Sequence, residues 1–265
     1  MKRLLITGAA GSLGRLCRAR LGDLAETLRL SDLAEMAPAG PGEEVVRCNL
    51  ADSNAVQDLV QGCDSIVHLG GIAVESSFET ILQGNLIGTY NLYEAARKAG
   101  VRRIAFASSN HAIGFHTRET RLGPDAPVRP DTLYGVSKCF GEALARLYHD
   151  KFGIESALIR IGSCFPEPSD HRMLATWLSP DDLIRLLERV LRAPRLGCPI
   201  IYGVSANDEC WWDNSHVAYL GWHPQDNAEI YRAALDACMS PPQADDPQVR
   251  YQGGGMAAAG HFEDQ

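Results

Sequence analysis

The sequence predicts an α/β fold with a doubly wound parallel sheet, and two patterns carry that prediction. Short apolar runs alternate with amphipathic segments along most of the chain, and closely spaced glycines follow the first apolar run. Strands that alternate with helices form βαβ units, whose right-handed crossovers leave the strands parallel in one sheet.

Seven apolar runs are candidate strands and five amphipathic segments are candidate helices. The strands are expected at residues 3–7, 27–31, 45–48, 65–69, 103–107, 155–160 and 199–202. The helices are expected at residues 13–21, 53–61, 78–99, 134–152 and 181–192.

The chain has 265 residues and 45% hydrophobic content, enough to bury one sizeable core. Prolines at 166, 168, 180, 194 and 199 interrupt the alternation, which indicates a small substrate-covering region attached to the sheet. Residues 240–265 are rich in Pro, Gly, Ala and acidic side chains, and this composition predicts a tail that is either mobile or laid across a neighbouring subunit. We therefore expect one domain over 1–239, with substrate-covering segments from about residue 163 onward, and a tail over 240–265.

Charge and composition exclude several classes of function. The formal net charge is −8 and no run of Lys and Arg stands out, so nucleic acid is not an expected partner. No stretch approaches the roughly 20 apolar residues that cross a bilayer, so no membrane partner is expected. The eight cysteines are scattered without a C-x-x-C pair, which favours reduced thiols in a cytoplasmic protein over disulfides. The histidines lack metal-ligand spacing, so no metal is expected.

A dinucleotide site is indicated by Gly8, Gly11 and Gly14, which follow the apolar run 4–6 and lead into a candidate helix. Glycines there let the backbone approach a pyrophosphate at a helix N-terminus, as in Rossmann-type folds. Asp32 ends the second strand 18 residues after Gly14, where an acidic side chain bonds the adenosine ribose and repels the 2′-phosphate of NADP. NAD is therefore the expected cofactor; the alternative for Asp32 is an ordinary helix cap.

Further candidate positions follow the carboxyl ends of other strands, where ligands lie in open α/β sheets. Asn49 and Leu50 are expected beside the adenine, and small residues after the fourth strand let the chain pass close to the cofactor. The expected cofactor-binding residues are Gly8, Gly11, Ser12, Leu13, Gly14, Asp32, Leu33, Asn49, Leu50, Leu69, Gly70, Gly71, Ile72, Lys138 and Ile161.

The candidate reacting groups are Tyr134, Lys138 and Ser109. Tyr134 and Lys138 are four residues apart in a candidate helix and so share one face. A free tyrosine has a pKa of about 10, but a nearby ammonium and a positively charged nicotinamide lower that pKa and make general-base work feasible. A Tyr–Lys pair by itself is more often a surface pair. With the glycine turn upstream and Ser109 after the fifth strand, the three are expected to carry redox chemistry on an alcohol or carbonyl.

With these motifs the chain resembles the extended short-chain dehydrogenases/reductases over residues 1 to about 165. The resemblance implies a Rossmann sheet, NAD(P) and a catalytic Ser–Tyr–Lys set. The chain lacks the Val-Tyr-Gly that usually follows the serine in this superfamily, and its C-terminal region is short for a sugar-nucleotide enzyme. The matching segments are the glycine turn, Asn85-x-x-Gly88-Thr89-x-Asn91-Leu92, Ser108-Ser109 and Tyr134-x-x-x-Lys138.

Longer runs make the chain similar to the bacterial uronate dehydrogenases over nearly its whole length. This resemblance implies oxidation of the C1 hydroxyl of D-glucuronate or D-galacturonate, in the pyranose form, to an aldarolactone with release of NADH. Tyr134 would take the hydroxyl proton, Ser109 would hold the same oxygen, and Lys138 would favour the phenolate. Asn49 departs from the Asp more common in that family, which alters only adenine-side contacts. The similar runs are 108–111, 133–142, 160–164, 172–174, 211–214 and 249–254.

A uronic acid needs a cation for its carboxylate and polar groups for its hydroxyls. Arg172 lies past the Pro-rich turn after the sixth strand, and a guanidinium binds a carboxylate in a fork. The alternative for Arg172 is a solvated surface arginine with no substrate role. The alternative for His111 is a histidine that only packs or caps a loop. Trp211 and Trp212 are expected in the core or at a subunit contact. The expected substrate-binding residues are Val74, Ser109, Asn110, His111, Ser163 and Arg172.

Two other functions remain open beside NAD-dependent oxidation of a uronic acid. A nucleotide-sugar epimerase or dehydratase would keep the same Ser, Tyr and Lys but release no net NADH. A redox-sensing protein that binds dinucleotide without turnover has no need of all three side chains. The tail and the long 78–99 segment favour a homo-oligomer, and the sequence does not indicate the number of subunits.

Overall fold

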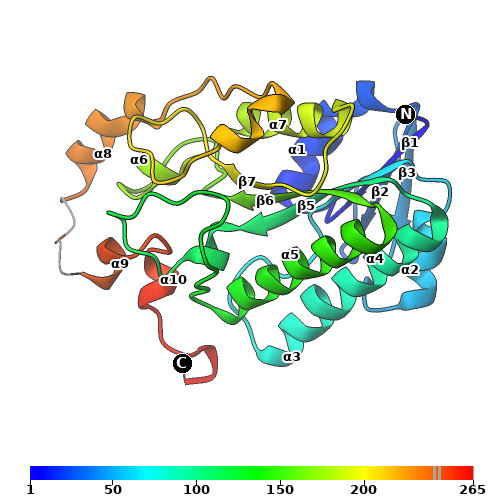
Figure 1. Ribbon diagram of the computed structural model, residues 1–265, viewed down its shortest axis with the longest axis horizontal. Coiled ribbons are helices and arrows are strands. Elements are labelled where there is room, and N and C mark those ends of the chain that lie inside the picture. The colour runs from blue at the N-terminus through cyan, green and yellow to red at the C-terminus, as the bar shows by residue number, and fades with distance from the viewer. Residues whose placement is uncertain (241–242, 244–245, 265) are drawn as a thin grey trace.

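The computed structural model describes residues 1–240, 243 and 246–264, and a seven-stranded parallel sheet lies at the centre of this part (Figure 1). The strand order is β3-β2-β1-β4-β5-β6-β7, so the chain starts near the middle, builds to one edge and then to the other. This confirms the doubly wound parallel sheet. The strands are β1 (Arg3–Thr7), β2 (Thr27–Asp32), β3 (Glu43–Arg47), β4 (Ser65–His68), β5 (Arg103–Ser109), β6 (Glu155–Ile161) and β7 (Ile200–Gly203).

Helices cover both faces of the sheet, with α1 and α7 on one face and α2, α4 and α5 on the other (Figure 1). Short 3₁₀ turns lie at Gly22–Leu24, Asn110–Ile113, Ser215–Leu220, Ala228–Tyr231 and Phe262–Asp264. The α-helices are α1 (Ser12–Arg20), α2 (Ser53–Val60), α3 (Phe78–Ile81), α4 (Gly88–Ala99), α5 (Leu133–Phe152), α6 (Met173–Thr176), α7 (Pro180–Arg192), α8 (Arg232–Cys238), α9 (Pro247–Arg250) and α10 (Gly255–Ala258).

The segment predicted as one helix over 78–99 is helical throughout but not uniform. A π-helical stretch at Leu82–Ile87 separates α3 from α4. A π-helical turn holds extra backbone per turn and is frequent at functional sites. Hydrophobic periodicity averages over such a local change, so the sequence could not reveal it.

The core has two layers because neighbouring side chains of a strand point to opposite faces. Leu4 and Ile6 of β1 pack in the cluster that includes α1 and α7, while Leu5 packs in the cluster that includes α2 and α4. All three side chains are completely buried. Both faces of the central strand are therefore covered, as a parallel sheet requires.

Helix α5 lies against β5 and β6 through a small residue and a buried ion pair. A Cβ at Gly141 would lie 2.3 Å from Cζ of Phe106, so the helix backbone sits directly on that ring. The Glu142 carboxylate accepts hydrogen bonds from Arg160 at 2.8 and 2.9 Å and from the Ser108 hydroxyl at 2.6 Å. Arg160 is 1% exposed, so losing either partner would leave a buried charge without compensation. This contact fixes the helix that carries the predicted tyrosine and lysine.

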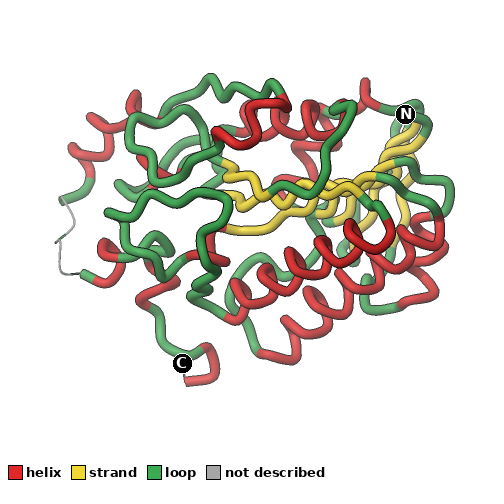
Figure 2. Tube along the Cα trace, viewed as in Figure 1, coloured by secondary structure: helices red, strands yellow, loops and turns green. Residues whose placement is uncertain are grey.

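The C-terminal segment 246–256, which belongs to the predicted tail, folds back on its own chain. Tyr251 forms a bridge with Thr117, and Gln252 is completely buried. Figure 2 shows that this end of the molecule consists mainly of loops and short helices. Residues 241–242, 244–245 and 265 of the predicted tail lie outside the described residues.

Trp211 and Trp212 belong to a small core cluster, as predicted. The Trp212 ring stacks on that of Tyr202, with centroids 5.4 Å apart. Within residues 1–240, 243 and 246–264, no helix combines the length and apolar character needed to cross a membrane. All eight cysteines are free thiols. Subunit number and cellular location stay predictions.

Candidate active site

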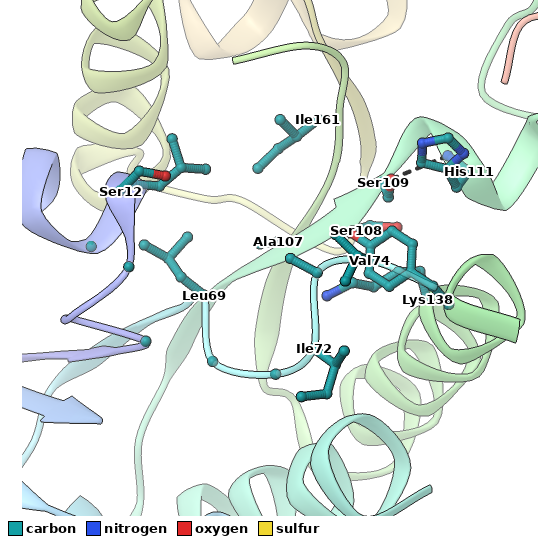
Figure 3. A pocket seen from close by; sticks show the side chains of 18 of the residues that line it. Ser12, Leu69, Ile72, Val74, Ala107, Ser108, Ser109, His111, Lys138 and Ile161 are labelled. Atoms are coloured by element: carbon teal, nitrogen blue, oxygen red, sulfur yellow. Dashed lines mark hydrogen bonds between the residues drawn. The ribbon is translucent and has the colours of Figure 1, made fainter. Parts of the chain in front are cut away.

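A pocket of about 860 Å³ lies at the carboxyl ends of the parallel strands. Every residue predicted to bind cofactor, bind substrate or take part in catalysis lines this pocket. Figure 3 shows Ser12 and Leu69 at one end, with Ser109, His111 and Lys138 at the other. The sequence therefore named a set of residues that the fold brings together, and their individual roles are proposals.

The turn between β1 and α1 has no room for side chains at two of its glycines. Gly8 has φ +72°, and a Cβ there would lie 2.7 Å from the Leu69 carbonyl carbon. A Cβ at Gly14 would lie 2.1 Å from the Gly8 oxygen. Both distances are far below contact, so the turn requires glycine and presents bare backbone to the pocket.

The amino end of α1 opens into the pocket beside this turn. Gly11 is the N-cap, no side chain caps the helix, and Ser12 and Leu13 line the pocket. The first N–H groups of a helix have no intrahelical acceptor, and the helix dipole adds partial positive charge there. This arrangement fits a pyrophosphate.

Asp32 lies at the end of β2 with its carboxylate held by backbone. One oxygen accepts a hydrogen bond from the Ala10 amide at 2.9 Å, and the other accepts from the Ala34 amide at 3.0 Å. Leu33, 56% exposed, and Asn49 line the same end of the pocket. The carboxylate is thus fixed by two backbone amides at the edge of the pocket, and its role toward an adenosine ribose stays a prediction.

The loop after β4 is clamped by Asn85, to which the sequence had assigned no role. Its Oδ1 accepts from the Ile72 amide at 2.7 Å, and its Nδ2 donates to the Ile72 carbonyl at 2.9 Å and to the Ser137 hydroxyl at 2.8 Å. Gly71 has φ +133°, and a Cβ there would lie 2.8 Å from Asn85 Oδ1. Asn85 stands in the segment that resembles the extended family, which was the available signal.

A buried histidine supports the same loop from behind. His68 Nδ1 lies 2.7 Å from the Thr7 hydroxyl oxygen, which also accepts from the Gly70 amide at 3.2 Å. Burial, with a smaller contribution from the charge of Lys138, lowers the pKa of His68 to about 3. The ring is therefore neutral near pH 7 and acts as a hydrogen-bonding group rather than a cation.

The first turn of α5 is fixed by two capping groups. The Thr132 hydroxyl accepts from the Gly135 amide at 2.9 Å. The Glu75 carboxylate accepts from the amides of Leu133 at 3.0 Å and Tyr134 at 2.9 Å. A carboxylate at a helix N-terminus is favoured by the dipole, so these contacts hold the tyrosine at the pocket wall.

The Tyr134 hydroxyl lies in a less favourable setting for ionisation than the sequence predicted. Burial raises its pKa, and a hydrogen bond with Ser109 only partly opposes this effect. Desolvation outweighs the expected lowering because the side chain is 7% exposed. The expected lowering of the Tyr134 pKa needs positive charge in the pocket beyond what the chain itself places there.

Lys138 is one turn further along α5, and its position is as buried as that of Tyr134. Its ammonium nitrogen lies 5.4 Å from the centre of the Tyr134 ring and 5.3 Å from that of Phe106. Burial lowers the pKa of Lys138 to about 8, while the Glu142 carboxylate opposes this shift. The side chain is therefore mostly a cation near pH 7.

Arg172 is held in the pocket by neutral partners, not solvated at the surface. Nε donates to the Gln252 carbonyl at 2.7 Å, and Nη1 donates to the Ser163 hydroxyl at 3.2 Å. The Asn110 amide, oriented to satisfy its neighbours, accepts from Nη2 at 2.6 Å and donates to the Ile161 carbonyl at 3.1 Å. Burial lowers the pKa of Arg172 to about 10. The result is a charged guanidinium whose hydrogen-bond partners in the described chain are uncharged.

His111 is paired with a buried carboxylate that the sequence did not reveal. Its Nδ1 lies 2.9 Å from Asp131, whose side chain is completely inaccessible. The Ser109 hydroxyl accepts from the His111 amide at 3.1 Å, and the His111 and Tyr134 ring centres are 5.9 Å apart. The carboxylate places a proton on Nδ1, which leaves Nε2 as the nitrogen for another partner.

Three pocket-lining residues come from the C-terminal segment, which the sequence had assigned to a tail: Gly253, Gly255 and Met256. The glycine run 253–255 indicates close backbone contact, but the sequence does not reveal which distant residues are contacted. In residues 1–240, 243 and 246–264, no group of three or more His, Cys, Asp or Glu side chains is arranged to hold a metal ion.

Comparison with known proteins identifies the family. A model of the NAD dependent epimerase/dehydratase family matches residues 4–180. The uronate dehydrogenase of Agrobacterium fabrum is 64% identical over 254 residues, which is 96% of each chain. The chain belongs to this family and, within it, to the uronate dehydrogenases.

Solved structures agree with this assignment. A mutant uronate dehydrogenase from Agrobacterium tumefaciens complexed with NAD has a TM-score of 0.97 at 62% identity and covers 99% of both chains. A glucuronic acid dehydrogenase from Chromohalobacter salexigens has a TM-score of 0.98 at 56% identity and covers 100% of this chain and 99% of its own. NAD is thus the cofactor of this NAD-dependent oxidoreductase, and the glycine turn, the free amino end of α1 and the anchored Asp32 fit it.

Replacing Gly14 by alanine is expected to raise the Kd for NAD at least about tenfold, because the new methyl group must push the turn away from the pyrophosphate. Titration of intrinsic fluorescence with NAD measures this. Gly22→Ala is the matched control, since a Cβ there meets no atom within 4 Å. Unchanged NAD affinity in a folded Gly14→Ala protein would contradict the assignment of the turn.

Replacing Lys138 by methionine is expected to stabilise the fold near pH 7 by on the order of 3 kcal/mol at most. The pKa of Lys138 in the folded protein, about 8, lies below the ordinary lysine value of 10.5. Below about pH 8 the buried ammonium lowers the free energy of unfolding by its full amount. This penalty disappears as the pH rises toward 10.5, because Lys138 then loses its proton in the folded state and keeps it only in the unfolded state.

Urea unfolding of both proteins near pH 7 and near pH 10 tests this. The stability difference between them should shrink at the higher pH. Lys98→Met on the exposed face of α4 is the control, because that side chain is 47% exposed. A difference that stays constant with pH would rule out a buried Lys138 charge.

Proposed function

We propose that this protein oxidises the C1 hydroxyl of D-glucuronate and D-galacturonate, in their pyranose forms, to the corresponding aldarolactones. One observation carries the proposal beyond family membership. The pocket that contains Ser109, Tyr134 and Lys138 also holds the Arg172 guanidinium, whose partners in the described chain are uncharged. A buried cation beside a redox site calls for an anionic substrate.

In the proposed reaction Tyr134 takes the proton of the C1 hydroxyl. Bound NAD supplies the acceptor for the hydride that leaves C1. The Ser109 hydroxyl bonds the same substrate oxygen, and the Lys138 ammonium favours the phenolate form of Tyr134. Because C1 of a pyranose also carries the ring oxygen, loss of hydride and proton turns the hemiacetal into a lactone without a hydrolytic step.

Arg172 would bind the substrate carboxylate in a fork. Because the Nε–H of Arg172 already donates to a backbone carbonyl, the two terminal nitrogens would bind the carboxylate. Asn110, Ser163 and His111 supply hydrogen-bonding groups for the sugar hydroxyls. Val74, which lines the pocket while 57% exposed, would contact the ring.

Absorbance at the NADH band tests the function. Purified protein is mixed with NAD or NADP and with D-glucuronate, D-galacturonate or D-glucose. NADH formation with the uronates and not with glucose would support both the hydride transfer and the carboxylate requirement. If a protein that binds NAD forms no NADH with either uronate, the proposal is overturned. That result would favour a nucleotide-sugar epimerase, which shows no net cofactor change.

Tyr134→Phe is expected to reduce kcat by roughly 10²–10⁴-fold, because general-base catalysis contributes about that much. NAD binding should persist, since the cradle at the other end of the pocket is untouched. Tyr219→Phe is the matched control, as that tyrosine is 59% exposed. Near wild-type turnover in Tyr134→Phe would exclude it as the base.

Arg172→Met is expected to raise KM for the uronates by about tenfold or more, because a charge-assisted fork is lost. The Kd for NAD should change little. Arg121→Met serves as the control, since the Arg121 side chain is 67% exposed. If KM stays the same, Arg172 does not hold the carboxylate.

A further inference from the structure

Gln252, near the C-terminus, is hydrogen-bonded through every polar group it has. Its amide nitrogen Nε2 donates to the carbonyls of Thr117 at 3.0 Å and Thr120 at 2.9 Å, and its Oε1 accepts from the Trp212 indole at 2.8 Å. Its backbone amide donates to the His116 carbonyl at 2.9 Å. The residue is completely buried. A buried glutamine with this many partners has one orientation, because any other leaves polar groups unpaired.

The remaining polar group of Gln252, its carbonyl, accepts the hydrogen bond from Arg172 Nε at 2.7 Å. The neighbouring backbone adds a steric wall. Gly254 has φ +63°, and a Cβ there would lie 2.5 Å from Arg172 Cδ. The arginine stem therefore lies flat on the Gly254 backbone, while its Nε donates to the carbonyl of Gln252, two residues earlier.

The same segment also reaches the carboxylate behind His111. A Cβ at Gly253 would lie 1.8 Å from an oxygen of Asp131, and the Gly253 amide donates to the Gly114 carbonyl at 2.9 Å. Asp131 is the partner of His111 Nδ1. Two of the proposed substrate-binding side chains thus rest, directly or through one residue, on the backbone of residues 252–254.

We propose that residues 251–256 are a positioning element of the substrate site, in which Gln252 locks the segment and its carbonyl sets the direction of the Arg172 fork. The segment is thereby part of the carboxylate subsite rather than a tail. This inference rests on the proposed function, because it takes Arg172 as the carboxylate ligand.

An arginine side chain has many rotamers, and holding it in one costs up to about 2 kcal/mol of conformational entropy. A carbonyl that accepts from Nε and a backbone that flanks Cδ order the side chain before substrate arrives. Both terminal nitrogens then lie in the plane that a bidentate carboxylate requires. Loosening the segment should weaken uronate binding through Arg172 and leave the proton-transfer groups in place.

The test is a double-mutant cycle on uronate kinetics with Gln252→Leu, Arg172→Met and the combined variant. Gln252→Leu keeps the volume and removes the three side-chain hydrogen bonds. KM for the uronate is expected to rise about tenfold in this variant, with kcat within about threefold of wild type and the Kd for NAD unchanged. In the Arg172→Met background the same change should have no further effect, because the group it positions is absent.

Gln248→Leu is the matched control, since Gln248 is an exposed glutamine just outside residues 251–256, in helix α9. Gly254→Ala is a second variant that disturbs the contact between this segment and the Arg172 side chain. Its control is Gly260→Ala, because a Cβ at Gly260 meets no atom within 4 Å. If Gln252→Leu does not fold, Gly254→Ala takes its place in the cycle.

Additive effects of Gln252→Leu and Arg172→Met would overturn the inference, as would a loss confined to kcat or to NAD binding, or an unchanged KM. A wild-type protein that forms no NADH from uronates would instead overturn the proposed function. An active wild type with an impaired Arg172→Met and an unimpaired Gln252→Leu would overturn only the positioning role.

Discussion

The reacting end of the site depends on how helix α5 is seated on strands β5 and β6. The Glu142 carboxylate joins Arg160 of β6 to Ser108 of β5, and Gly141 lets the helix backbone touch Phe106. Ser108 is next to Ser109, and Glu142 is one helical turn from Lys138. A shift of α5 would therefore break a buried ion pair and separate the catalytic candidates in the same movement. The chemistry of the site and the stability of this layer share one contact.

Charge is distributed along the pocket in a way that suits two different anions. At one end the bare glycine turn and the amino end of α1 offer backbone N–H groups, which attract a diphosphate without a fixed positive side chain. At the other end two buried cations, Lys138 and Arg172, lie among hydroxyl and amide groups. Burial lowers the pKa of both side chains, so an anionic partner would stabilise the charged form of each. Two carboxylates near these cations, Asp131 and Glu142, already have partners in His111 and Arg160.

Much of the fold and the site was predictable because it follows from local rules. Short apolar runs that alternate with amphipathic segments predict a parallel sheet, and glycines after the first strand predict a nucleotide turn. What escaped prediction was held by long-range contacts. Asn85 clamps a loop from inside a π-helical stretch, and Asp131 pairs with His111 from 20 residues away. The lowering of the Tyr134 pKa was expected from the lysine and the nicotinamide together, and in the chain alone desolvation raises that pKa, an effect that depends on everything packed around the ring.

The sequence by itself determined the order of strands and helices, the place of the cofactor turn and the spacing of tyrosine and lysine, because each of these is set by neighbours within a few residues. Only the tertiary structure decided that Gly253, Gly255 and Met256 line the pocket. Gln252 meets Thr117, Trp212 and Arg172, which stand 135, 40 and 80 positions away in the chain. Composition could describe this segment as a polar, glycine-rich tail, but hydrogen bonds between residues so far apart are selected by the packed fold and leave no local pattern.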